Sequence, residues 1–307
     1  QLRLLDLDID EANFQIGIHT AGVGVGLLLA GTDDDSCVTD FQHGLVFAFQ
    51  ALLQRNTLAF PVLGTDTVTR TIGFRRVKLV MNEGAWRAIP PQTQGKYPIT
   101  LELNGRKIFA KGSNVVSPDI FFSKITPERY ETLVQYAVDA NMNIFRMWGG
   151  SPVNKECFFD ACDRLGMMVW QEFTLSCNNY PDDAHYLEML EKESASIIKR
   201  LRVHPSVVLW CGGNELFNSW SGMPDQSLAL RLLNKLTYDL APEIPYIMTS
   251  PLDGMKHGGY TFIDRTTGLD QFALFTRSKG TTYTEFGIPG ITSVEEIRSM
   301  IPEDELF

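Results

Sequence analysis

The sequence predicts two domains: a β-sandwich over residues 1–82 and, over residues 99–307, an α/β barrel of the (β/α)8 class that is incomplete at its C-terminal end. Residues 1–82 read as short alternating segments separated by Gly, Asp and Asn turn residues, a pattern typical of a sandwich. A polar connection with three prolines, residues 83–98, is the predicted linker. From residue 99 strands and helices alternate, and polar residues stand where several strands end, as in (β/α)8 barrels.

The predicted elements of the second domain follow one another at the spacing of βα units. Strands are expected at 108–114, 143–148, 167–172, 206–211, 246–250 and 281–287, with a weaker candidate at 269–275. Helices are expected at 126–140, 154–165, 182–203, 226–240 and from 293 onward, several of them marked by a capping residue, Pro or Gly. Only 22 residues follow Glu285, too few to complete eight units, so an incomplete barrel is expected.

Composition excludes several classes of protein. The formal net charge of −10 opposes a general affinity for nucleic acid or for an anionic membrane. No apolar run approaches the ~20 residues that cross a bilayer, and no signal segment opens the chain, whose first residue is Gln1 rather than Met. The compartment stays undetermined, and a neutral ligand such as a sugar fits this charge.

The five cysteines are scattered, odd in number and without metal-binding spacing, so we interpret them as buried or inert thiols. The glycine-bearing run 22–26 lacks the spacing of a phosphate loop and is interpreted as a strand. The acidic run 33–35 lacks the Gly and distal Glu of a calcium loop and is interpreted as a turn. No metal or cofactor is expected.

Two predicted strands end in a carboxylate. The run 206–215 is a short β-branched strand that delivers Asn214 and Glu215 to its C-terminal end, and the run 281–287 delivers Glu285 in the same way. Two acids at two strand ends predict a paired-carboxylate site, in which one carboxyl donates a proton and the other stays ionised.

Six segments in order resemble glycoside hydrolase family 2, and within it the β-mannosidase-like branch. They are 69–75 (TRTIGFR), 103–114 (LNGRKIFAKGSN), 143–150 (NIFRMWGG), 170–173 (WQEF), 210–215 (WCGGNE) and 284–287 (TEFG). The resemblance implies that the sandwich is immunoglobulin-like and that the barrel is a TIM-type catalytic domain. It implies a retaining, exo-acting β-glycoside hydrolase, with Glu215 as general acid/base and Glu285 as nucleophile.

The same resemblance implies roles for neighbouring side chains. Asn214 would hydrogen-bond the 2-hydroxyl of the sugar, and Arg146 would keep the nucleophile ionised. Trp148 and Trp170 are candidates for an aromatic wall against the sugar ring, with packing in the barrel core as the alternative. Glu172 is expected to support the site through a hydrogen bond.

The sequence assigns no catalytic role to a histidine. His185 and His257 are expected to lie on the surface or in loops, and the sixth-strand region lacks the family's His-containing segment. A non-catalytic carbohydrate-binding or scaffold protein is the alternative function, as are other family 2 activities: exo-β-glucosaminidase, β-galactosidase and β-glucuronidase. An incomplete barrel exposes sheet edges, so a homo-oligomer or a second chain that completes the barrel is a possible partner.

Overall fold

The computed structural model describes residues 19–20, 25–26, 54–61, 65–81, 99–252, 254–278, 282–287, 290 and 292–305. The chain divides into two compact units, residues 1–45 and 46–307. In the first unit β1 (His19–Thr20) pairs antiparallel with β2 (Val25–Gly26), which includes part of the glycine run that we interpreted as a strand. The acidic run 33–35 lies outside the described residues.

The second unit begins with antiparallel strands. β3 (Gln54–Pro61) pairs with β4 (Thr65–Ile72) in a hairpin. β5 (Val77–Met81), β6 (Ile99–Leu103) and β7 (Arg106–Ile108) form a three-stranded antiparallel sheet. Asn104 and Gly105 both have positive φ, +51° and +78°, as a tight two-residue hairpin turn requires. β5 comes from the range predicted as sandwich and pairs with β6 from the range predicted as barrel, and the sandwich itself stays a prediction.

Parallel strands organise the rest of the unit, as the sequence predicts for an α/β domain. β8 (Gly112–Val115), β9 (Ile144–Met147), β10 (Met168–Glu172), β11 (Val207–Cys211) and β12 (Tyr246–Ile247) form one parallel sheet in the order β12-β11-β10-β9-β8. β13 (Met255–His257) and β14 (Thr282–Glu285) form a second parallel pair. The carboxyl ends of these strands carry the side chains described below.

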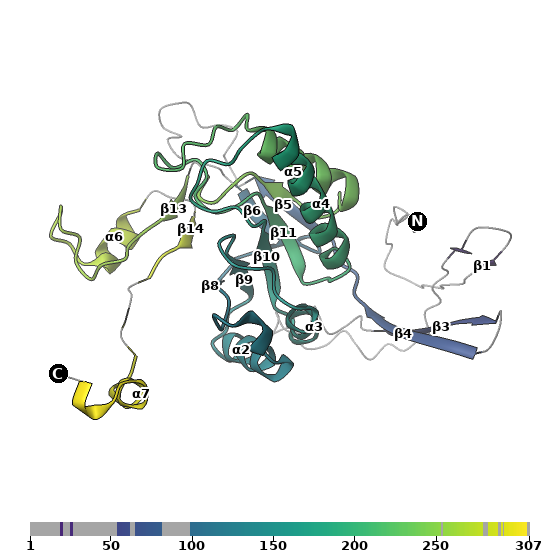
Figure 1. Cartoon of the computed structure of the whole chain (residues 1–307), viewed down its shortest axis with the longest axis horizontal. Helices are drawn as coiled ribbons and strands as arrows, with labels where there is room; N and C mark the ends of the chain where they lie inside the picture. The colour runs from purple at the N-terminus through teal and green to yellow at the C-terminus, as the bar shows by residue number, and fades with distance from the viewer. Residues whose placement is uncertain are drawn as a thin grey trace. The chain divides into compact units, whose positions relative to one another are not determined.

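Helices follow most of these strands (Figure 1). They are α2 (Pro127–Asp139), α3 (Glu156–Leu165), α4 (Ala184–Leu201), α5 (Leu228–Leu240), α6 (Gln271–Arg277) and α7 (Val294–Met300), with 3-10 turns η2 (Phe122–Lys124) and η3 (Glu303–Glu305). Their ends match the sequence signals: Thr126 caps α2, Gly166 at φ +76° ends α3, and Ser293 accepts a hydrogen bond from the backbone of Glu296 to cap α7.

The prediction of a strand at 269–275 is wrong, because these residues begin a helix. Asp270 caps α6 by accepting a hydrogen bond from the backbone of Ala273 at 2.7 Å, and this local bond favours a helical turn over an extended chain. The strand of this region is instead β13, only three residues long and followed by Gly258 and Gly259. Its alternation is too short to be seen in the sequence.

Both faces of the parallel sheet are buried along β10 and β11, which explains why these strands read as continuous apolar runs. Along β10, Val169 packs in the cluster that includes the helices, whereas Met168 and Trp170 pack in a second cluster with residues of β5 and β6. On β11, Val207 and Val208 divide between the two clusters in the same way. The sheet is therefore held from both sides, and its strand ends are fixed in place.

Candidate active site

The carboxyl ends of the parallel strands bring one group of polar side chains together. Six strands contribute to it, each through its last residues or the residues just after it. The group consists of Asn114 on β8, Arg146 on β9, Glu172 on β10, Asn214 and Glu215 after β11, His257 on β13 and Glu285 on β14. Hydrogen bonds of Arg146 and His257 connect the five-stranded sheet to the β13–β14 pair.

Arg146 lies at the centre of this group and is only 4% exposed. Its Nε donates to Glu172 at 2.8 Å, and its Nη1 donates to Asn114 at 2.8 Å and to Glu285 at 2.9 Å. Its Nη2 donates to Oδ1 of Asn214 at 2.5 Å. A buried cation requires such partners, and the fixed fork of the guanidinium sets the angles between the side chains that it binds.

Glu172 lies beneath the site rather than in it. Its side chain is 0% exposed and accepts from Arg146 and from the backbone N–H of Gly149 at 2.8 Å. Burial raises the pKa of this carboxyl, and the charge of Arg146 and these hydrogen bonds oppose that rise. A side chain added at Gly149 would come within 2.4 Å of the carbonyl oxygen of Leu175, so only glycine fits there. The geometry matches the supporting role expected for Glu172, through its hold on Arg146.

Glu285 is arranged to stay ionised. Its side chain is 27% exposed, and it accepts hydrogen bonds from Arg146 at 2.9 Å and from the hydroxyl of Tyr260 at 2.9 Å. Burial alone would raise the pKa of this carboxyl, but the hydrogen bonds from Arg146 and Tyr260 and the charge of Arg146 outweigh burial and lower it. A carboxylate in this state is a nucleophile rather than an acid.

Glu215 occupies a strained backbone position next to Glu285. Its φ is +54°, in the left-handed region that a residue with a side chain rarely adopts, and such strain persists where surrounding structure enforces it. Its Oε1 lies 2.8 Å from Nδ1 of His257 and its Oε2 lies 3.4 Å from Sγ of Cys177. Ligand atoms of Glu215, His257 and Glu285 all lie within 4.8 Å of one another, so the two carboxyl groups face each other closely.

The expectation that His257 lies on the surface or in a loop is wrong. The residue lies on β13 and its side chain is 7% exposed, because parallel pairing of β13 with β14 carries it between the two glutamates. Tyr260, three residues later, was also missed. The one local signal near both residues is the glycine pair Gly258 and Gly259 between them, which marks the end of a short strand.

Cys177 is not one of the buried thiols that the sequence allowed. It is exposed, has φ +49°, and its Sγ accepts from Nδ2 of Asn214 at 3.2 Å while it faces Glu215. Asn214 itself is 2% exposed, and Arg146 engages its Oδ1, which leaves Nδ2 as its donor on the site side.

The two tryptophans lie at different depths. Trp170 is 9% exposed, packs in the cluster with β5 and β6, and places its ring 5.8 Å from the guanidinium of Arg146. Trp148 is partly exposed just after β9, and its ring lies under Gly150, where an added side chain would come within 2.2 Å of it. Trp148 is therefore the more accessible of the two.

Two groups among the described residues bring potential metal ligands together, and neither offers a free set. The first group consists of Glu215, His257 and Glu285. There, Arg146 and Tyr260 already hydrogen-bond Glu285, and the nearby positive charge of Arg146 opposes a cation. The second group contains His204 with Asp160 and Asp163. There, both ring nitrogens of His204 are already hydrogen-bonded to carboxylates, one of Asp163 and one of Glu156.

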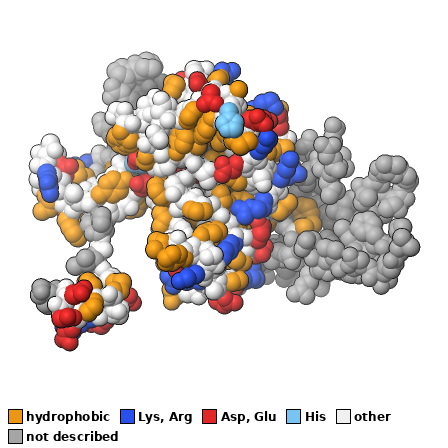
Figure 2. Space-filling view, viewed as in Figure 1, with side chains coloured by type: hydrophobic (Ala, Val, Ile, Leu, Met, Phe, Trp, Pro, Cys, Tyr) orange, Lys and Arg blue, Asp and Glu red, His pale blue; other side chains and the backbone are white. Residues whose placement is uncertain are grey.

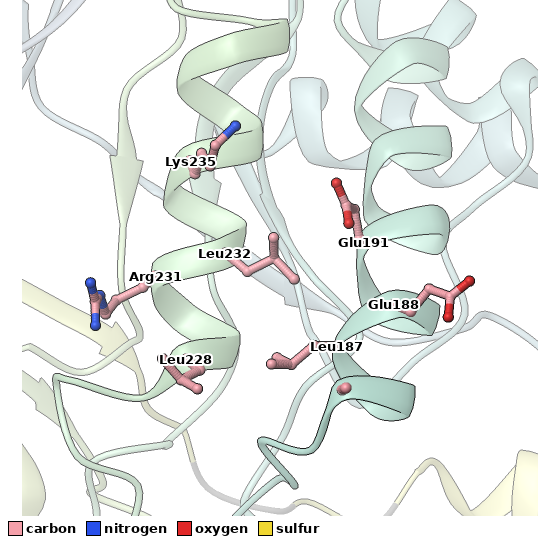
Figure 3. A pocket seen from close by; sticks show the side chains of 8 residues that line it. Leu187, Glu188, Glu191, Leu228, Arg231, Leu232 and Lys235 are labelled. Atoms are coloured by element: carbon pink, nitrogen blue, oxygen red, sulfur yellow. The ribbon is translucent and has the colours of Figure 1, made fainter.

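A groove of about 530 Å³ lies elsewhere, between α4 and α5. Figure 3 shows Leu187 of α4 and Leu232 of α5 pointing toward each other across it, with Glu191 and Lys235 further along.

Acidic and basic side chains are interspersed on the face of the molecule in Figure 2. Among the helices of the described ranges, none combines the length and apolar character that a membrane crossing needs.

The chain is similar to β-mannosidases in sequence and in structure. No family model matches the chain. β-Mannosidase B of Thermothelomyces thermophilus is 30% identical over 267 residues, which cover 77% of this chain and 30% of that protein. β-Mannosidase of Rattus norvegicus is 36% identical over 169 residues, 50% of this chain and 19% of that protein. The crystal structure of a β-D-mannosidase from Dictyoglomus thermophilum superposes with a TM-score of 0.67 at 30% identity, covering 77% of this chain and 30% of that one.

The chain thus spans less than a third of the length of these relatives. The structural likeness covers 77% of this chain, and the parallel sheet described above is compatible with the α/β part of the predicted fold. Over the range that the two share, the chain is similar to β-mannosidases, which supports the resemblance to the β-mannosidase-like branch of glycoside hydrolase family 2.

Proposed function

We propose that the strand ends carry the catalytic pair of a retaining, exo-acting β-glycoside hydrolase with β-mannosides as its substrates. Glu285 is the nucleophile and Glu215 the general acid/base. The observation that carries the proposal is that one carboxylate oxygen of Glu215 lies within 4.8 Å of one carboxylate oxygen of Glu285, closer than the separation that leaves room for the attacking water of an inverting enzyme. Retaining enzymes have carboxyl groups about 5–5.5 Å apart, whereas inverting enzymes need about 6.5–9.5 Å to admit a water.

The electrostatic surroundings support the division of roles. Arg146 and Tyr260 donate hydrogen bonds to Glu285 and lower its pKa, as a nucleophile requires. In the first step Glu285 attacks the anomeric carbon while Glu215 gives its proton to the leaving oxygen. In the second step Glu215 takes a proton from water, the water oxygen bonds to the anomeric carbon, and Glu285 leaves as a carboxylate.

Specificity in this proposal comes from the neighbours of the pair. Nδ2 of Asn214 donates to the 2-hydroxyl of the sugar, a contact that strengthens in the transition state. Trp148, which is partly exposed, packs against the sugar ring in this proposal, and Trp170 acts through its contact with Arg146. β-Mannosides are the proposed substrates because the relatives above are named β-mannosidases.

The test is hydrolysis of aryl β-mannoside, β-glucosaminide, β-galactoside and β-glucuronide by the purified chain and its Glu215→Ala and Glu285→Ala variants. We expect the mannoside to be cleaved with retention and Glu215→Ala to lower kcat by about 10²–10⁴-fold. Azide should restore Glu285→Ala and give a product of inverted configuration. Glu188→Gln, an exposed glutamate on α4, is the control that should keep full activity.

Absence of hydrolysis of all four glycosides would overturn the proposal. Thermal stabilisation by mannose without any hydrolysis would instead favour the alternative of a carbohydrate-binding protein.

A further inference from the structure

Two hydroxyl groups continue the hydrogen-bond chain that begins at Glu215. Nδ1 of His257 lies 2.8 Å from Oε1 of Glu215, and Nε2 of the same ring lies 3.1 Å from Oγ of Ser250. Oγ of Ser250 lies 2.8 Å from Oγ1 of Thr284, the residue just before Glu285. The chain therefore starts at one proposed catalytic residue and ends beside the other.

We propose that Ser250 and Thr284 are positioning residues, which hold His257 in its Nδ1–H tautomer and so leave Oε2 of Glu215 as the oxygen that carries the catalytic proton. The inference deepens the proposed function and rests on the roles given there to the two glutamates.

Which atom donates in each of these hydrogen bonds follows from the protons that each group can supply. An ionised carboxylate only accepts, so Nδ1 of His257 must carry the proton that faces Glu215. A neutral imidazole has one N–H, so its Nε2 must accept, and the hydroxyl of Ser250 supplies the donor. Ser250 has then used its single proton, so the hydroxyl of Thr284 donates to Ser250.

The surroundings of His257 favour the neutral imidazole ring that this series of hydrogen bonds requires. Burial lowers the pKa of His257 and the positive charge of Arg146 lowers it further, against the opposing hydrogen bond of Glu215 and the negative charges of Glu285 and Glu215. Tyr260 faces the same group through its hydrogen bond to Glu285 and stays neutral, because burial and that carboxylate raise its pKa.

The tautomer decides which oxygen of Glu215 takes part in chemistry. With N–H directed at Oε1, an O–H on that oxygen would meet another donor, so the proton of the acid form sits on Oε2. The exposed Cys177 thiol donates to Oε2 at 3.4 Å when Glu215 is ionised, and its sulfur can accept when Oε2 carries the proton. That proton passes to the leaving oxygen in the first step, and a proton from water returns to Oε2 in the second. His257 keeps its own proton throughout. In the other tautomer the bare Nδ1 would draw the proton onto Oε1, away from the substrate.

The first test needs no turnover. Nitrogen-15 NMR of the imidazole nitrogens reports the tautomer, and the signals of His257 are those lost in His257→Asn. We expect the Nδ1–H form in the wild type and a larger share of the Nε2–H form in Ser250→Ala and in the isosteric Thr284→Val. Thr284→Ser should restore the wild-type tautomer, and Thr282→Val, two residues earlier on β14, should leave it unchanged. An Nε2–H wild type, or variants with an unaltered tautomer, would overturn the proposal.

The second test separates positioning of the proton from general damage. Because kcat/KM reports the step that breaks the glycosidic bond, Thr284→Val should lower it about tenfold for a mannoside with a poor alkyl leaving group. For a dinitrophenyl mannoside, whose leaving group needs no acid, Thr284→Val should leave kcat/KM unchanged. Equal losses on both substrates would reject this proposal alone. Full activity in Glu215→Ala and Glu285→Ala would reject the proposed function, whatever the tautomer.

Discussion

Two histidines at opposite ends of β11 each bind a carboxylate, yet their surroundings favour opposite protonation states. His204 precedes the strand, with Nδ1 2.7 Å from Asp163 and Nε2 3.0 Å from Glu156. His257 meets the residues that follow the strand, with a carboxylate at Nδ1 but a hydroxyl at Nε2. Burial alone would lower the pKa of either ring. At His204 the bonds and charges of the two carboxylates outweigh burial and raise the pKa, whereas at His257 burial and Arg146 prevail and lower it.

The partner at the second nitrogen explains much of this difference. Two carboxylates can both be satisfied only by a ring with two N–H groups, which is the cation. A hydroxyl can donate, so it also satisfies the neutral ring. The first arrangement joins α3 to the start of β11 as an ion pair, and the second leaves a neutral ring beside the proposed acid.

Removing Arg146 should have the largest effect on the difference in protonation between His204 and His257. Arg146→Met leaves the fully buried Glu172 without its cation, and breaking such a pair costs about 3–5 kcal/mol of unfolding free energy. The same change should raise the pKa of His257 and of Glu285, because the neighbouring positive charge is lost. Denaturant unfolding measures the first effect, and NMR titration of His257 measures the second.

Arg164→Met is the matched control for this prediction. Arg164 forms a two-bond contact with Glu131 in which both side chains are about half exposed, so its loss should cost within about 1 kcal/mol. If the pKa of His257 stayed the same in Arg146→Met, Arg146 would not be what distinguishes the two histidines.

The pH dependence of stability should have opposite signs at the two histidines. His204 has a raised pKa in the folded state, so its contribution is fully present below the unfolded value of about 6.5 and is lost as pH rises through the folded value. His257 has a lowered folded pKa, so stability rises with pH between that lowered value and about 6.5. Melting temperatures of His204→Gln and His257→Gln, each compared with the wild type across pH 5–8, measure the two contributions.

The stabilisation that His204 provides should therefore shrink toward pH 8, and that of His257 should grow. Two curves with the same slope would contradict the assignment of opposite protonation states.

The sequence predicts much of the site because its main residues lie at the ends of local patterns. The β-branched runs before Glu215 and Glu285 and the strand that carries Arg146 are short-range signals, and the structure brings all three residues together. Asn214 follows from the same run as Glu215, and Glu172 follows from the predicted strand at 167–172. Their catalytic roles stay predictions.

The rest of the site depends on contacts between distant segments. His257 reaches Glu215 across 42 residues through the pairing of β13 with β14, and no periodicity in a three-residue strand announces that pairing. The wrong strand prediction at 269–275 has the related cause that a capping bond of Asp270, invisible to apolar spacing, begins α6 there. Glycines at 258 and 259 made this region read as irregular, whereas it contributes both His257 and Tyr260.

The smallest expected effect concerns Glu156, the second of the two carboxylates that bind His204. Glu156→Gln replaces a half-exposed acid that also contacts Arg200 at 3.3 Å, so unfolding free energy should fall by only about 0.5 kcal/mol. The pKa of His204 should nevertheless fall, because an amide oxygen accepts the Nε2–H without a negative charge to favour the cation. NMR titration of His204 measures this shift, with Glu188→Gln on α4 as a control of equal charge change. An unchanged pKa would mean that Asp163 alone holds the cation, and the partner at the second nitrogen would no longer explain why the two histidines differ.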